Sequence, residues 1–96
     1  MSKYLLLYRV DPSAGVPEST PEQQEASLQT WMAWFGRTGE ALVDAGAPVM
    51  GGDGTVGGYS IVDVADEAAL APVLDDHPHA AYGTIDVLPF VAIPGA

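Results

Sequence analysis

Residues 3–10, KYLLLYRV, decide the fold. This run of Leu, Tyr and Val contains no Gly or Pro and ends at Asp11-Pro12, so it predicts a β-strand. Successive side chains of a strand point to opposite faces of its sheet. One face then carries Tyr4, Leu6, Tyr8 and Val10, and the other carries Leu5, Leu7 and Arg9. Both faces are largely apolar, so both need to be covered.

A long helix is expected next. Residues 20–23 (TPEQ) place Thr at the N-cap, Pro at the first helical position and Gln at the third, which is typical of a capping box. The helix should run to about Ala45, where Gly46 and Pro48 end it. Helical spacing predicts one buried stripe, made of Leu28, Trp31, Met32, Phe35, Gly39, Leu42 and Val43. Trp34 lies off that stripe and is expected at an interface or in a pocket wall.

The rest of the chain supplies three more strands and a helix. A short second strand is expected near 49–50 or 55–56, within a glycine-rich segment, and a clearer one at 59–64. A second helix should open at Asp66 and end at Pro78, with Pro72 bending it or delaying its start. Its inward stripe is Leu70, Val73, Leu74 and His77. The last strand is expected at 84–93, with Pro89 marking an edge or a bulge.

The order β-α-β-β-α-β predicts a single ferredoxin-like α+β domain over residues 1–96, an antiparallel sheet with two helices on one face. The other face should then be polar, but the first and last strands are apolar on both faces. Such a patch usually marks an interface. The sequence therefore predicts a homodimer packed through its sheet faces, a dimeric α/β barrel.

Composition excludes several partners. The 96 residues carry a formal charge of −10, and the three basic residues are Lys3, Arg9 and Arg37. Without a basic cluster, neither nucleic acid nor an anionic membrane is an expected partner. The chain has no Cys, no long apolar segment and no signal-peptide pattern at its start, so a cytoplasmic location is expected.

Several segments resemble a known family. KYLLLYR, the WMAWF helix leading to ALVDAGAPVMGG, GGYSIVDV and DDHPHAAYGTIDVLPF resemble, in order, the YCII-related family on the side that includes the DGPF-domain proteins. The resemblance implies a dimeric α+β barrel. The best-known activity it implies is dehydrochlorination of a chlorinated hydroxyhydroquinone.

The resemblance does not carry over a catalytic site. The YCII type pairs a His on the first helix with an Asp, but this chain has no His on its first helix. Asp53-Gly54 is followed by Thr55-Val56 instead of Pro-Phe. The segments that do match are His77-Pro78 and residues 83–89, where relatives often have Glu in place of Asp86.

His77 and Asp86 are the candidate catalytic pair. His77 is expected to face inward at a helix C-terminus, where the helix dipole favours imidazolium. A partner such as Asp86 would hold it as a general acid or base. The alternative is a structural His bonded to the last helix carbonyls. Asp86 is either an ordinary exposed carboxylate or, between two sheets, a desolvated base. His79 is expected in a solvated turn.

Candidate substrate-binding residues are Arg9, Tyr4, Tyr8, Trp34 and Tyr59. Arg9 could bind a substrate carboxylate, or it could form an ion pair with an acidic neighbour such as Asp63. The tyrosines fit a barrel core, although their hydroxyls could also orient a ligand.

Two functions remain open. The first is a small-molecule enzyme that needs no cofactor or metal and transfers a proton on an aromatic or carbonyl compound in an inter-sheet cleft, by isomerisation, cyclisation or HX elimination. The second is a non-catalytic ligand-binding or accessory module.

Overall fold

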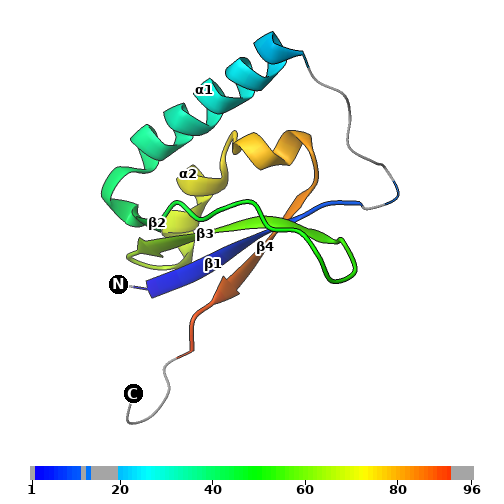
Figure 1. Ribbon diagram of the computed structural model, residues 1–96. Coiled ribbons are helices and arrows are strands. Elements are labelled where there is room, and N and C mark those ends of the chain that lie inside the picture. Colours follow the sequence, from blue (N-terminus) through cyan, green and yellow to red (C-terminus); the bar gives the residue numbers. More distant parts are fainter. Residues whose placement is uncertain (1, 12, 14–19, 92–96) are drawn as a thin grey trace.

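The four strands form one antiparallel sheet in the order β2-β3-β1-β4 (Figure 1). The computed structural model describes residues 2–11, 13 and 20–91. The strands are β1 (Ser2–Arg9), β2 (Leu42–Asp44), β3 (Val56–Val64) and β4 (Thr84–Pro89). The helices are α1 (Pro21–Thr38) and α2 (Leu70–Leu74), with 3₁₀ turns η2 (Gly39–Ala41), η3 (Glu67–Ala69) and η4 (Pro78–Ala81). The predicted α+β class is confirmed, and the arrangement is compatible with a ferredoxin-like fold.

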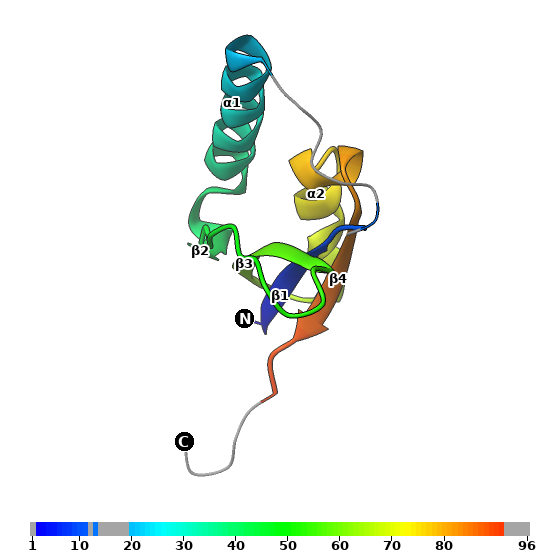
Figure 2. The same ribbon diagram turned by 45° about the vertical axis from the view of Figure 1, so that its right-hand side comes forward.

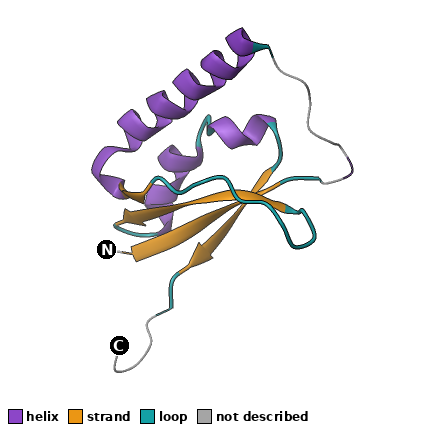
Figure 3. Cartoon of the chain, viewed as in Figure 1, coloured by secondary structure: helices purple, strands orange, loops and turns teal. Residues whose placement is uncertain are grey.

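Both helices lie on the same side of the sheet (Figures 2 and 3). The face that they cover carries Leu6 and Tyr8 from β1 and Val62 and Val64 from β3, all of them buried. These side chains form one core with Trp34, Leu70 and Val73. Within the described residues, no helix is long and apolar enough to cross a bilayer.

α1 begins where the sequence predicts and ends earlier. Thr20 Oγ1 accepts the Gln23 N–H at 3.1 Å, and Gln23 Oε1 accepts the Thr20 N–H at 2.9 Å, so the capping box is confirmed. The helix stops at Thr38 because Gly39 takes a positive φ of 58° and closes it. The predicted end at Ala45 is wrong.

The residues after Gly39 form the second strand instead of more helix. Leu42 pairs with Val62, and Asp44 pairs with Ile61. The predicted positions for this strand, 49–50 or 55–56, are therefore wrong, and Val56 belongs to the start of β3. Leu42 is apolar because it packs against the core from a sheet edge, and not because it continues a helical stripe.

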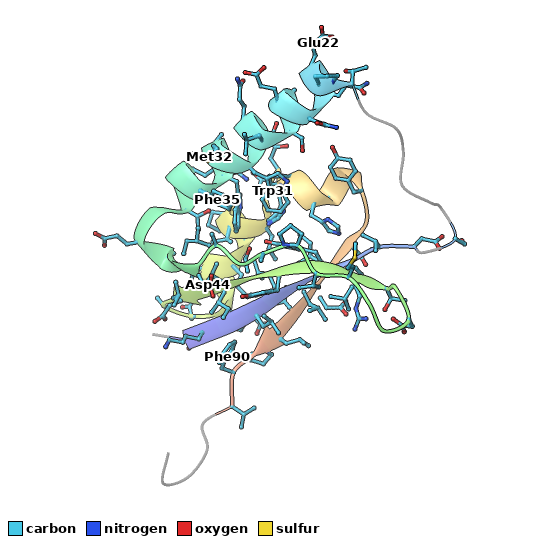
Figure 4. The ribbon with its side chains drawn as sticks, in the orientation of Figure 1. Glu22, Trp31, Met32, Phe35, Asp44 and Phe90 are labelled. Carbon is cyan, nitrogen blue, oxygen red and sulfur yellow. The ribbon has the colours of Figure 1, made fainter. Side chains whose placement is uncertain are left out.

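The buried face of α1 is rotated from the predicted one. Leu28 and Met32 are exposed to 60% and 59%, whereas Trp34 is exposed to only 1%. The Nε1–H of Trp34 donates to the Val73 carbonyl at 2.9 Å and so ties α1 to α2. Trp31 and Phe35 lie on the sheet side of the helix, and Met32 lies on the other side (Figure 4). The placement of Trp34 outside the core is wrong.

The second helix is shorter than predicted. Asp66 caps η3 through a bond from the Ala69 N–H to Asp66 Oδ1, and α2 starts only at Leu70. The delayed start agrees with the expected effect of Pro72. Because α2 ends at Leu74, His77 is not at its C-terminus but is the N-cap of η4.

β4 is an edge strand, as Pro89 suggested. The Phe90 N–H donates to the Lys3 carbonyl at 3.0 Å. Hydrogen-bonding groups alternate in direction along an antiparallel strand, so the nitrogen of Pro89 faces away from β1. The predicted extension of this strand to Ile93 is wrong at Phe90 and Val91, because β4 ends at Pro89; residues 92–93 lie outside the described residues.

Candidate functional site

An apolar pocket of about 500 Å³ lies on the helix side of the sheet. Leu28, Trp31 and Phe35 of α1 form one wall, and Tyr8 of β1 and Val10 just after it form another. The remaining lining comes from segment 45–48, from residues 57–59 and from His79 and Tyr82. The residues that line the pocket are mostly apolar, and several of them are aromatic.

Segment 45–48 approaches β3 closely. Gly46 has a φ of 80°, and a Cβ at this position would lie 1.6 Å from the Tyr59 carbonyl oxygen. Only glycine fits there, because both the backbone conformation and the available space exclude a side chain. The pocket wall thus depends on Gly46.

A directed hydrogen-bond chain runs beneath the pocket. The His79 backbone N–H donates to His77 Nδ1 at 3.0 Å, so that nitrogen carries no proton. Neutral His77 therefore has its proton on Nε2, which donates to Tyr8 Oη at 3.1 Å. The Tyr8 hydroxyl donates to Ser60 Oγ at 2.7 Å, and Ser60 donates to the Ala45 carbonyl at 2.8 Å. Each side chain in this series accepts one hydrogen bond and donates the next, so the direction of one bond determines the direction of the following one.

Burial keeps both titratable members of this chain neutral. It lowers the pKa of His77 to about 4, with smaller contributions from the charges of His79 and Arg37. It raises the pKa of Tyr8 to about 12, an effect that the hydrogen bond with Ser60 partly offsets. The His77 ring also packs against Trp34, with ring centroids 4.4 Å apart. The predicted imidazolium is wrong, because burial favours the neutral ring, whose nitrogens bond to Tyr8 and to the His79 N–H instead of to helix carbonyls.

His79 lines the pocket, and one nitrogen of its ring has no hydrogen-bond partner in the described part of the chain. Its Nε2 lies 2.8 Å from the Arg9 carbonyl, an oxygen that can only accept, so Nε2 carries the proton. A Cβ at Gly83 would lie 2.0 Å from that carbonyl oxygen, so the backbone packs tightly around the bond. In the neutral ring the lone pair is then on Nδ1, for which no hydrogen-bond partner is found in the described part of the chain.

His79 is only 6% exposed, so its expected position in a solvated turn is wrong. Asp63 Oδ1 is the one fully buried side-chain polar atom left unpaired among residues 2–11, 13 and 20–91. His79 is one of the residues that line the pocket. A carbonyl-oriented imidazole with a free nitrogen is the arrangement of a general base.

The structure does not bring His77 and Asp86 together. Asp86 pairs with Leu7 on the face opposite the helices, and His77 lies on the helix side. Asp86 instead forms an ion pair with Arg9, with Nε and Oδ2 2.8 Å apart, and Arg9 also donates to Thr55 Oγ1. The expected ion pair of Arg9 is thus present, with Asp86 as its partner instead of Asp63.

The aromatic candidates separate into two groups. Tyr8 and Tyr59 belong to the pocket lining. Tyr4 packs against the core, and Trp34 lies within it. Trp34 also borders a second hollow, which lies between α1 and the segment after α2 and includes Arg37 and Asp76. Of the predicted substrate-binding residues, Tyr8 and Tyr59 line the apolar pocket. Tyr59 pairs with Leu7, so its side chain points to the opposite face and its backbone, beside Gly46, lines the pocket.

His79 was hard to recognise as a site residue from the sequence. The turn η4 contains only Pro78–Ala81, too short for a hydrophobic period to reveal its buried side. The usable signal was Gly83, since a glycine directly before a strand often marks a close backbone approach.

The described residues contain no group of three or more His, Cys, Asp or Glu placed to hold a metal ion. No protein-family model matches the chain, and no curated protein matches it.

Proposed function

We propose that this protein binds a small, mostly apolar molecule in the helix-side pocket and transfers a proton on it without a cofactor, with His79 as the base. The observation that carries the proposal is the pairing of an aromatic pocket with an imidazole whose Nε2–H is held by the Arg9 carbonyl. This site takes the place of the inter-sheet cleft and of the His77–Asp86 pair. Membership of the YCII-related family remains a proposal, supported by the sequence segments alone.

A single base favours particular reactions. His79 Nδ1 would take a proton from a carbon acid and return it to another carbon of the same molecule, which is an isomerisation. In HX elimination it would take the proton while the C–X electron pair leaves with X⁻ and a C=C bond forms. Tyr8 contributes no acid, because its hydroxyl is committed to Ser60 and burial raises its pKa to about 12.

Hydrogen exchange on a carbon acid tests this function. The protein should exchange the α-protons of 2-tetralone, an uncharged aromatic ketone, for deuterium at least ~10-fold faster than D₂O buffer alone. His79→Gln retains an amide N–H for the Arg9 carbonyl but has no basic nitrogen, so the rate should fall to that of buffer. Loss of the α-CH signal in proton NMR measures both rates.

Two substitutions of Ala by Trp locate the reaction. Ala47→Trp fills the pocket and should abolish exchange, whereas Ala33→Trp, at an exposed position of α1 outside this pocket, should not. Exchange that survives His79→Gln would rule out His79 as the base. Binding of 2-tetralone without any exchange would favour the non-catalytic module.

We propose in addition that the protein is a homodimer through the sheet face opposite the helices. Leu5, Leu7 and Ile61 lie on that face by strand alternation, and Leu88 and Phe90 are exposed to 45% and 51%. Figure 4 places Phe90 on this side of the sheet. Asp63 Oδ1 lies on the same face and is buried without a hydrogen-bond partner. A donor on a second copy would supply the missing hydrogen bond. An apolar sheet face of this kind is costly to leave in water.

Leu7→Glu should convert the dimer to a monomer, because it places a charge at the centre of this face. Light scattering after gel filtration should give close to twice the 10.0 kDa chain mass for the wild type and the single-chain mass for the variant. Met50→Glu is the control, since Met50 is 96% exposed and lies elsewhere. A monomeric wild type would refute the dimer.

A further inference from the structure

We infer that the ligand of the helix-side pocket is an electrically neutral molecule, and that the pocket rejects carboxylates, phosphates and ammonium compounds. This inference rests on the proposed function and specifies its substrate class. It follows from where the chain places its charged side chains.

All three basic side chains lie away from the pocket. Arg9 is on the opposite face of the sheet, in its ion pair with Asp86. Arg37 donates to the carbonyls of Asp75 and Asp76 and borders the second hollow, between α1 and the segment after α2. Lys3 pairs with Asp63 in the register and lies six residues before Arg9 on β1, toward the other end of the strand. The full sequence has no fourth Lys or Arg, so no fixed cation can meet an anionic ligand there.

Among the described residues, the lining also contains no carboxylate. Apart from the tyrosine hydroxyls, His79 is the only titratable side chain that this part of the chain contributes to the lining. An ammonium ligand would therefore lose its hydration without gaining an opposite charge. The net charge of −10 opposes anions at long range as well.

Three naphthalene probes that differ only in one substituent test the inference. They are 2-naphthalenemethanol, 2-naphthoate and 2-naphthylmethylammonium, each titrated against the wild-type protein and followed by amide shifts in ¹⁵N NMR spectra. The alcohol should bind at least ~10-fold more tightly than either ion. The preference should persist at about 0.5 M NaCl, where the long-range field is screened but the lining is unchanged.

A matched pair of Arg substitutions tests whether the lack of a charged group at the pocket causes the preference for the neutral probe. Leu28→Arg adds a cation at the pocket and should tighten 2-naphthoate binding at least ~10-fold. Met32→Arg adds the same charge one turn along α1, at an equally exposed position outside the lining, and should change binding less than ~2-fold. Naphthoate binding as tight as the alcohol, with amide shifts in the pocket, would overturn the inference and leave the site intact. Failure of all three probes to shift the amides of residues 45–47, 57–58 and 79 would overturn the proposed function, and the inference with it.

Discussion

Replacing Trp34 with Ala should lower the free energy of unfolding by about 3–5 kcal/mol. The indole is 1% exposed, packs on Trp31, Phe35 and His77, and supplies the hydrogen bond to the Val73 carbonyl. The substitution leaves a cavity between α1 and α2 and an unpaired carbonyl. Urea unfolding followed by circular dichroism measures the loss.

Two further variants check this interpretation. Met32→Ala, on the exposed side of the same helix, should change stability by less than about 0.5 kcal/mol. Trp34→Phe should fall between the two, because it retains most of the packing and loses only the indole donor. A cost below about 1 kcal/mol for Trp34→Ala would mean that α1 is not held to the rest of the fold through this side chain.

Acidification should destabilise the protein through His77 by about 3 kcal/mol between pH 7 and pH 4. Burial lowers the pKa of the folded-state imidazole to about 4 from its ordinary value of 6.5. The unfolded chain therefore takes up a proton below pH 6.5 while the folded chain does not. The stabilisation is present in full above pH 6.5 and is lost progressively as the pH falls toward 4.

The 13 acidic residues also make the stability depend on pH. Comparing the wild type with a variant that lacks the His77 ring separates the contribution of His77 from theirs. His77→Gln removes the titrating ring, so the difference in unfolding free energy between wild type and variant should shrink as the pH falls from 7 to 4. Unfolding in urea at closely spaced pH values gives this curve. A difference independent of pH would show that the ring is not shielded from water as the structure indicates.

The sequence predicted the sheet better than it predicted its connections. β1 and the 59–64 core of β3 were recognisable because β-branched, aromatic and leucine residues run there without a breaker. The start of α1 was encoded locally by a capping box. Its end was not recognised, because Leu42 and Val43 continue the helical spacing even though they form an edge strand. Gly39 ends the helix. The sequence alone does not distinguish a glycine that ends a helix from one that allows close packing; the pairing of Leu42 with Val62 does.

The candidate site depended on contacts that no local pattern contains. His77 was correctly predicted to face inward, since the inward stripe of α2 pointed to it. Its protonation and partners were not predictable, because they come from Tyr8, Ser60 and the backbone of His79, far apart along the chain. His79 gained its role from the Arg9 carbonyl, a backbone group that any residue at position 9 would present.

Pro89 restricts how copies of this protein can associate. Its nitrogen points outward from the edge of β4 and offers no hydrogen to an incoming strand. Growth of the sheet sideways into a ribbon or filament is therefore interrupted at that end of the edge. The other edge of the sheet is β2, a strand of only three residues, so it offers a short stretch for pairing with an incoming strand.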